Sequence, residues 1–269
     1  MNRLYVCDQG SSGIAILDLR LREMQMFVPK GYGQLQLPLN CCVDDKGWLY
    51  VADAGRKQVV IFDNALQYIA ALGEGEGFKP NDVAVGNGRI WVADAKGNRI
   101  CVYDQSTREL LYSFPQAIKG DPGFVYIPTN IVVTDEQVFV SDMGDFGVKE
   151  YTHKGEFLGK LGSHGNRPGQ FARPKGIAVD KEGNLFVADA GFENVQVFNR
   201  DRTLLMYFGG PYQGPGDMYL PAKVCVDYGN LDYFRDLVDS RFDLRYLIYV
   251  TNQYGPDKIG VYGFVELRK

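Results

Sequence analysis

Four polar residues share one position of an internal repeat, where side chains of their types could bind a ligand. Each stands two residues after a proline: Asn40, Asp82, Asn130 and Lys223. Lys175 lies beside the equivalent position of a further repeat. A ring with one acid, one base and two amides would suit a small polar or zwitterionic ligand, or the loop of a protein partner, better than a polyanion. Because Asn and Asp also tolerate positive φ angles, a solvated rim without a binding role is the alternative.

The loops that lead into these prolines are long and rich in glycine and aromatic residues. Loops of this kind on a rigid scaffold usually carry function. Their aromatic side chains could supply apolar contact area around the polar ring: Tyr32, Phe78, Tyr126, Phe171 and Tyr219. We therefore expect a ligand or partner to bind the face on which these long loops lie.

The elements that must position these residues are short apolar runs. Residues 173–209 hold four of them, at 176–179, 185–188, 195–198 and 204–208, separated by the turn clusters KEGN, DAGFEN and NRDR. Short runs rich in Val, Ile, Phe and Leu between such turns are typical of β-strands. The second run recurs roughly every 40 to 50 residues, with one longer interval, and ends at Asp8, Asp53, Asp94, Asp142, Asp189 and Asn252. Six second strands predict an all-β, six-bladed propeller of four-stranded antiparallel blades.

The repeat resembles a known family. The runs PKGIAVD, GNLFVAD, NVQVFN and LLMYFG, and above all LGSHGNRPGQFARPKG at 161–176, are similar to NHL-type repeats, and nearly the whole chain is similar to a bacterial six-bladed NHL-like propeller. The resemblance implies one propeller domain over residues 1–269 with a central channel. Members include RNA-binding modules, amidating lyases and many bacterial exported proteins, some found alongside c-type cytochromes. Export or a periplasmic location is what the resemblance implies for a full-length protein.

The order of the runs predicts incomplete blades at both ends. Residues 4–6, 13–18 and 23–28 match second, third and fourth strands, whereas 223–227, 246–251 and 258–265 match first, second and third strands. We expect the first blade to lack its innermost strand and the last blade an outer one. A longer natural protein, or a ring that closes imperfectly and leaves an open strand edge, would each account for this.

One insertion interrupts the repeat, at residues 228–245 in the last blade. Leu231, Phe234, Val238 and Phe242 follow a helical spacing, and Asn230 is a candidate N-cap. The segment therefore predicts a short amphipathic helix over 231–238, with Phe234 packed on the propeller. A helix that docks a partner is the alternative.

Composition narrows the classes of partner. The chain has 269 residues, a net charge of −4 and no basic run, which argues against a nucleic-acid surface. Its apolar stretches are shorter than the roughly 18 residues of a membrane span. Five cysteines lie at scattered strand positions, and Cys7, Cys42 and Cys225 replace alanines of the repeat. We expect free, buried thiols rather than a disulfide framework.

The sequence favours binding over catalysis. His153 and His164 fall on opposite faces, and phosphate-loop, nucleophile-elbow and zinc-protease motifs are absent. The aspartates that close the second strands lie one per blade, which suits turn capping better than a calcium site. We expect no cofactor and no metal. The preferred function is a non-enzymatic binding or scaffolding propeller that acts through its long-loop face on a protein partner. The resemblance implies a place in a cytochrome-associated complex of a bacterial cell envelope. A lyase or hydrolase that uses the channel mouth is the alternative.

Overall fold

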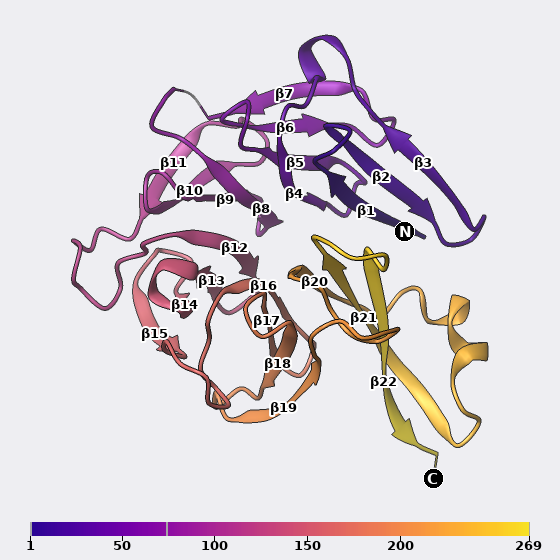
Figure 1. Ribbon diagram of the computed structural model, residues 1–269. Coiled ribbons are helices and arrows are strands. Elements are labelled where there is room, and N and C mark those ends of the chain that lie inside the picture. Colours follow the sequence, from indigo (N-terminus) through magenta and orange to yellow (C-terminus); the bar gives the residue numbers. More distant parts are fainter. Residues whose placement is uncertain (1, 74, 269) are drawn as a thin grey trace. The chain divides into compact units, whose positions relative to one another are not determined.

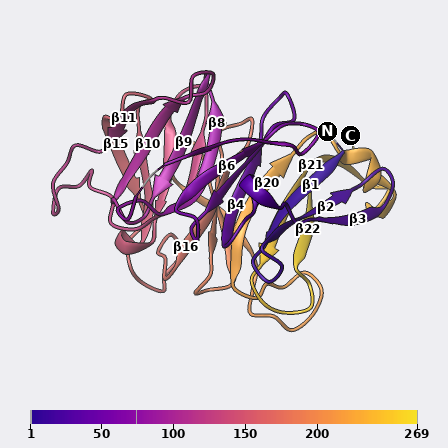
Figure 2. The same cartoon turned by 90° about the horizontal axis from the view of Figure 1, so that it is seen from above.

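The computed structural model describes residues 2–73 and 75–268, whose strands form six small antiparallel sheets (Figure 1). The chain folds as an all-β, six-bladed propeller in which each sheet is one blade, as the repeat predicts. In this part of the chain four sheets have four strands and two have three. Consecutive strands pair with each other within each sheet, and Figure 2 shows β8, β9 and β10 side by side.

The first three sheets follow one another along the chain. The first contains β1 (Arg3–Asp8), β2 (Gly13–Asp18) and β3 (Glu23–Phe27). The second contains β4 (Pro38–Val43), β5 (Leu49–Asp53), β6 (Gln58–Phe62) and β7 (Tyr68–Leu72). The third contains β8 (Pro80–Gly86), β9 (Arg89–Asp94), β10 (Arg99–Asp104) and β11 (Leu110–Phe114). A short 3-10 helix, η1 (Gly31–Gly33), lies between the first sheet and the second.

The last three sheets repeat the same plan. The fourth contains β12 (Pro128–Val133), β13 (Val138–Asp142), β14 (Gly147–Tyr151) and β15 (Phe157–Leu161), with the 3-10 helix η2 (Met143–Asp145) after β13. The fifth contains β16 (Pro174–Val179), β17 (Leu185–Asp189), β18 (Asn194–Phe198) and β19 (Leu204–Gly209). The sixth contains β20 (Pro221–Asp227), β21 (Phe242–Asn252) and β22 (Ile259–Leu267), with η3 (Leu231–Tyr233) and η4 (Arg235–Leu237) between β20 and β21.

The chain divides into two compact units. The first unit comprises Arg3–Asp18 and Glu23–Lys160 and holds the first four sheets up to Lys160. The second unit comprises residues from Leu161 onward, with Asn2 and Leu19–Arg22, and holds the fifth and sixth sheets.

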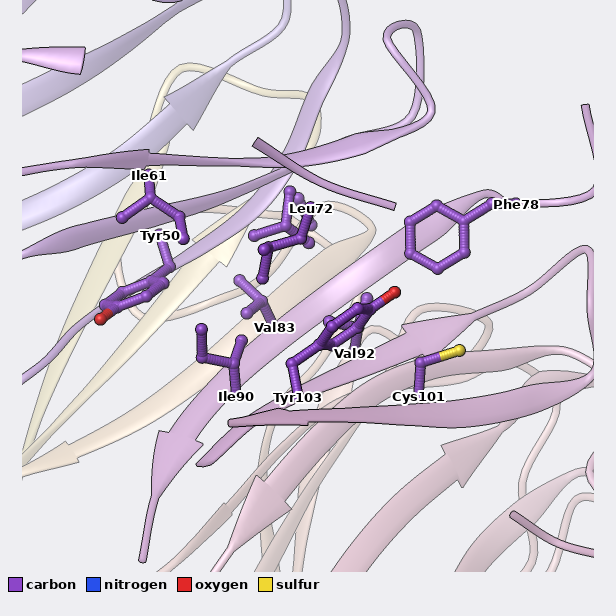
Figure 3. Packing of buried hydrophobic residues seen from close by; sticks show 11 residues of the cluster. Tyr50, Ile61, Leu72, Phe78, Val83, Ile90, Val92, Cys101 and Tyr103 are labelled. Atoms are coloured by element: carbon purple, nitrogen blue, oxygen red, sulfur yellow. The ribbon is translucent and has the colours of Figure 1, made fainter. Parts of the chain in front are cut away.

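The core of the first unit forms where the faces of neighbouring sheets meet. In one cluster, Tyr50 and Ile61 of the second sheet pack with Val83 and Val92 of the third (Figure 3). All four side chains are at most 1% exposed. Burial of one such side chain contributes roughly 1.5–3 kcal/mol. Neighbouring blades therefore stabilise each other, as a meander that cannot bury its own faces requires.

The number of strands at the two ends agrees with the prediction. β1 to β3 supply the second, third and fourth strand positions of the first sheet, and β20 to β22 supply the first, second and third positions of the sixth. Within the described residues, the first sheet therefore has three strands and no innermost one, and the sixth has three and no outermost one.

The insertion does not form the predicted helix. Residues 231–238 form two single 3-10 turns, and the Asn230 side chain makes no capping hydrogen bond, although its amide nitrogen donates to Asp227 Oδ2. A helix this short is marginal without such a cap. Residues from Phe242 extend β21 instead, where they pair with the far end of β22. Phe234 does pack on the sheet, with its ring 6.2 Å from that of Tyr249.

The five cysteines, which all lie in the described part of the chain, form no disulfide bond, as predicted. The expected burial holds fully for Cys101, whereas Cys7, Cys41 and Cys42 are half-buried. It is wrong for Cys225, which is exposed. Side chains alternate along a strand, and the neighbouring Val224 takes the buried face of β20.

Candidate binding site

A pocket of about 710 Å³ lies in the first unit, beside the second sheet. Three connecting segments form most of it: the loop between β3 and β4, the turn between β5 and β6, and the loop after β7. The first residues of β6 and β7 complete it. Polar and aromatic side chains line it together with three glycines: Gly31, Tyr32, Gln34, Gln36, Gly55, Arg56, Lys57, Gln58, Tyr68, Gly75 and Glu76. These segments include long loops on which the sequence predicts binding, and Tyr32 is one of the predicted contact residues.

The loop from β3 to β4 lies close to the second sheet because Gly33 has no side chain. A Cβ at this position would lie 2.8 Å from the ring of Phe62 and 3.2 Å from Cβ of Tyr68. Such distances require a neighbour to move. Gly33 thereby places the preceding Tyr32 beside Tyr68, with ring centroids 6.3 Å apart. Tyr32 is 86% exposed, so one large aromatic side chain stands in solvent at the pocket.

Arg56, in the turn between β5 and β6, also holds this loop in place. Its Nη1 donates to the carbonyl oxygens of Tyr32 (2.8 Å) and Gln34 (2.7 Å). Its Nε and Nη2 donate to Oε1 of Gln58 at 3.2 and 3.0 Å. The guanidinium therefore uses most of its five donors on groups of this pocket. We conclude that Arg56 positions the loop that carries Tyr32.

Asp53 fastens the end of the same loop to the following turn. Its carboxylate accepts hydrogen bonds from the backbone N–H groups of Gln36 (2.7 Å), Leu37 (2.9 Å) and Arg56 (3.0 Å). Asp53 is fully buried, so these bonds replace its lost hydration. The loop and the turn that line the pocket are therefore held by one side chain.

The same tie recurs in three further sheets. Asp94 accepts from Lys79 and Gly97, and Asp142 accepts from Tyr126, Ile127 and Gly144. Asp189 accepts from Ala172, Arg173, Gly191 and Phe192. The turn-capping role predicted for these aspartates is confirmed. The hydrogen bonds from the long loops to these aspartates were not predicted. A signal for them exists in the sequence, because the last loop residue that donates to each aspartate is followed by the proline that begins the first strand.

Lys57 and Glu76 form an exposed ion pair at the pocket. Their Nζ and Oε2 atoms are 2.5 Å apart, and the side chains are 36% and 88% exposed. The hydrogen bond from Lys57 lowers the pKa of Glu76. Exposed pairs of this type contribute little to stability. Each of the two side chains can therefore give up this ion pair and bind a charged group of a partner instead, at a small cost in free energy.

The polar residues of the predicted ring lie elsewhere, directly after a β-bulge. In the second, third and fourth sheets the first-strand proline pairs with the aspartate just described, and the register then shifts before Asn40, Asp82 or Asn130. Lys223 follows the same shift in the sixth sheet. A bulge re-aims the side chain that follows it.

Within the first unit, this re-aiming joins neighbouring sheets. Asp82 is fully buried, and its Oδ2 accepts from Asn130 Nδ2 (3.1 Å) and from the backbone N–H of Ile131 (3.0 Å). Asn40 Nδ2 donates to the carbonyl oxygen of Asn81 (2.7 Å). These side chains therefore have structural partners on a neighbouring blade. A ligand-binding role for the ring stays a prediction.

In the second unit, Lys175 and Lys223 lie on β16 and β20 and are half-buried. Burial and the nearby charge of Arg173 lower the pKa of Lys175. Next to Lys175 on β16, a Cβ on Gly176 would lie 2.6 Å from Cα of Lys223 and from the backbone nitrogen of Val224 on β20. This close approach of two strands explains why the fifth sheet keeps glycine where the other sheets have Asn, Asp or Lys.

The predicted aromatic contact residues separate into three groups. Tyr32 and Tyr219 are exposed, at 86% and 44%. Tyr126 is half-buried, with its ring 4.9 Å from that of Phe124. Phe78 and Phe171 are 3% and 0% exposed, so they offer no contact area. Both rings fill space beside the last residues of a blade. The pattern of apolar and polar residues in the sequence did not reveal this burial.

The described residues contain no group of three or more His, Cys, Asp and Glu side chains that could hold a metal ion. His153 is half-buried in the first unit, where its Nε2 lies 2.8 Å from the carbonyl oxygen of Thr134. None of the helices in this part of the chain is long and apolar enough to cross a membrane.

Comparisons with known proteins bear on the class of this chain. The family model described as NHL repeat matches residues 79–103 and 171–198. Protein brain tumor of Drosophila melanogaster is 27% identical over 131 residues, which are 49% of this chain and 10% of that protein. NHL-repeat-containing protein 4 of Homo sapiens is 38% identical over 73 residues, which are 27% of this chain and 58% of that protein. The chain thus spans only part of the length of these two relatives.

A solved structure shares the fold over almost the whole chain. Virginiamycin B lyase from Staphylococcus aureus aligns with 97% of this chain and 80% of its own, with a TM-score of 0.63 and 12% sequence identity. Identity this low shows a common fold only. The six sheets and the recurring aspartate ties define a repeat-built β-propeller. Two of its repeats match the NHL-repeat model, so the chain is a six-bladed β-propeller that is similar to NHL-repeat proteins, as the sequence predicted.

Proposed function

We propose that this propeller is a non-enzymatic binding module that holds an extended segment of a partner protein against the pocket beside the second sheet. The observation that carries the proposal is Tyr32, an exposed aromatic residue on a loop that Arg56 and Asp53 immobilise. Tyrosine offers a large contact area and loses little conformational entropy on binding. A fixed loop lowers the cost further, because its backbone is already ordered before the partner arrives.

The polar side chains of the pocket match the chemistry of a peptide. Gln34, Gln36 and Gln58 each carry a donor and an acceptor, as does every peptide unit of an extended segment. Lys57 and Glu76 supply one charge of each sign, which suits a partner segment of mixed charge better than a polyanion. This agrees with the net charge of −4 and the lack of a basic run.

Selection of peptides on the intact protein tests the proposal. Twelve-residue peptides displayed on phage would be selected, and the affinities of the resulting synthetic peptides would be measured by calorimetry. We expect Tyr32→Ala to weaken binding by about tenfold or more, as loss of an aromatic anchor does. Tyr207→Ala is the matched control, because Tyr207 is 59% exposed on β19 and is not one of the pocket residues.

A charge variant adds a second measurement. Lys57→Ala removes one member of the exposed pair and should change the salt dependence of binding without unfolding the protein. Selected peptides that bind the Tyr32→Ala and Lys57→Ala variants as tightly as the unmodified protein would place binding elsewhere. The ring at Asn40, Asp82, Asn130 and Lys223 would then be the next candidate.

A further inference from the structure

We propose that the segment bound at the pocket beside the second sheet is proline-rich and adopts the polyproline II conformation. The inference rests on the proposed function and narrows the class of partner. A polyproline II segment makes no internal hydrogen bonds, and its prolines present carbonyl oxygens without N–H groups. A partner segment added as a β-strand needs acceptors as well as donors from its site. The hydrogen-bonding groups that the pocket leaves available therefore distinguish the two.

The backbone oxygens of the loop between β3 and β4 already accept hydrogen bonds from the protein itself. Nη1 of Arg56 donates to the oxygens of Tyr32 and Gln34 at 2.8 and 2.7 Å. The hydroxyl of Ser12 donates to the oxygen of Gln36 at 2.9 Å. An added strand would have to share each of these acceptors with a group of the protein.

Backbone N–H groups of the same loop are paired as well. Those of Gln36 and Leu37 donate to the carboxylate of Asp53 at 2.7 and 2.9 Å. The N–H of Gln34 donates to the oxygen of Gly31 at 3.1 Å. The loop therefore does not present the row of unpaired backbone groups that strand addition requires.

The side chain of Gln58 is oriented so that it offers a donor. Its Oε1 accepts from Nε and Nη2 of Arg56 at 3.2 and 3.0 Å. Because a guanidinium only donates, the oxygen of the amide must face Arg56, and the NH₂ group must lie on the other side. Gln58 lines the pocket, so this donor is available to a bound carbonyl oxygen.

Other polar side chains of the pocket also donate. Gln34 and Gln36 are exposed with their amide groups, and the hydroxyls of Tyr32 and Tyr68 can each donate one hydrogen bond. The carboxylate of Glu76, the charged acceptor of the pocket, is already in an ion pair. The pocket therefore suits a segment that is rich in carbonyl oxygens and poor in N–H groups.

Two tyrosine rings supply the apolar surface that proline rings need. The ring centroids of Tyr32 and Tyr68 are 6.3 Å apart with 30° between the ring planes, and the residues are 86% and 38% exposed. Aromatic surfaces of this kind bind proline-rich segments, which hold the polyproline II conformation before they bind. Such a segment loses little conformational entropy on a loop that is itself fixed.

The experiment uses the intact chain and a fluorescein-labelled peptide of ten prolines as the probe. A labelled Gly-Ser peptide of equal length is the comparison. We expect saturable binding of the proline peptide by fluorescence anisotropy and binding of the Gly-Ser peptide that is weaker by about tenfold or more. Tyr68→Ala should weaken binding of the proline peptide by about tenfold, because it removes one of the two rings.

Gln58→Glu tests the hydrogen-bonding argument. A glutamate still accepts from Arg56 but has no NH₂ group to donate, so binding of the proline peptide should weaken by about three- to tenfold. Gln67→Glu is the matched control, because Gln67 is exposed, adjoins Tyr68 and is not one of the pocket residues. It adds the same charge and should leave binding unchanged. Circular dichroism checks that each variant is folded.

The outcomes separate this inference from the proposed function. Phage-selected peptides that require Tyr32 but contain no proline, together with absence of binding to the proline peptide, would leave the pocket a peptide site and overturn the inference. Binding of the proline peptide that both Tyr68→Ala and Gln58→Glu leave unchanged would also overturn it. A selection without any Tyr32-dependent peptide, together with absence of binding to the proline peptide, would overturn both proposals.

Discussion

The carboxylate of Asp53 accepts a hydrogen bond from the backbone N–H of Leu37 at 2.9 Å, across sixteen residues of the chain. This bond joins the end of a strand to the loop that enters the sheet. The same carboxylate also caps the turn at Arg56. One buried side chain therefore fixes two of the three segments that line the candidate binding site.

Asp53→Asn should lower the free energy of unfolding by about 1–3 kcal/mol, because an amide offers one acceptor oxygen and turns its NH₂ group toward a buried N–H donor. Denaturant unfolding followed by circular dichroism measures the effect. Asp8→Asn is the control, since Asp8 is half-exposed and caps its turn through Gly10. Equal losses in the two variants would mean that the tie to Leu37 adds nothing.

Asp82→Ala should cost about 2–4 kcal/mol of stability, because the backbone N–H of Ile131 and the amide of Asn130 would lose a buried acceptor. Asn40→Ala should cost less, because the carbonyl of Asn81 keeps a second lone pair and Asn40 is only half-buried. Thermal unfolding of both variants checks the order. An Asp82→Ala protein as stable as the unmodified one would show that Asp82 has no structural role, and a binding role would again be the better explanation for it.

Gly176→Ala should destabilise the protein by about 1–3 kcal/mol, since its Cβ would lie 2.6 Å from backbone atoms of Lys223 and Val224. Gly159→Ala on β15 is the matched control, because a Cβ there meets nothing within 4 Å. That change should be close to neutral. Urea midpoints compare the two, and a neutral Gly176→Ala would show that β16 and β20 can separate without loss.

Stability should fall at alkaline pH because several tyrosines are buried. Burial raises the pKa of Tyr50 and of Tyr262 to about 12, and it raises the pKa of Tyr103, Tyr151 and Tyr246 as well. The folded state thus favours the neutral phenol. The stabilisation is complete below the ordinary tyrosine pKa of about 10 and is lost as the pH rises toward about 12.

Ultraviolet absorbance of phenolate during a pH titration measures this effect. We expect one group of the 17 tyrosines to ionise reversibly and a second group to ionise only as circular dichroism reports unfolding. Tyr50→Phe should remove part of the second group. Ionisation of all tyrosines in one step near pH 10, with the fold intact, would contradict the expected burial.

The insertion in the sixth sheet shows where local pattern misleads. The spacing of Leu231, Phe234 and Val238 is helical, yet the residues form two 3-10 turns. The pairing of Phe242 with Leu267 decides the outcome, because strand pairing there removes the last residue of the helical stripe. Nothing in the sequence of the segment itself indicates that Phe242 pairs with a residue twenty-five positions further along the chain.

The sequence alone determined the fold, the number of blades and the strand order at both ends, because each blade repeats the same alternation of apolar runs and turns. It also indicated that the long loops could carry a site. Tertiary structure decided which side chains are available there. Asn40, Asp82 and Asn130 occupy the same repeat position, and the bulge before each one turns it toward a neighbouring blade, where hydrogen-bond partners close in space are remote in sequence. Exposure of Tyr32 and burial of Phe78 likewise depend on how loops pack against sheets, which a pattern of residue types along one strand does not encode.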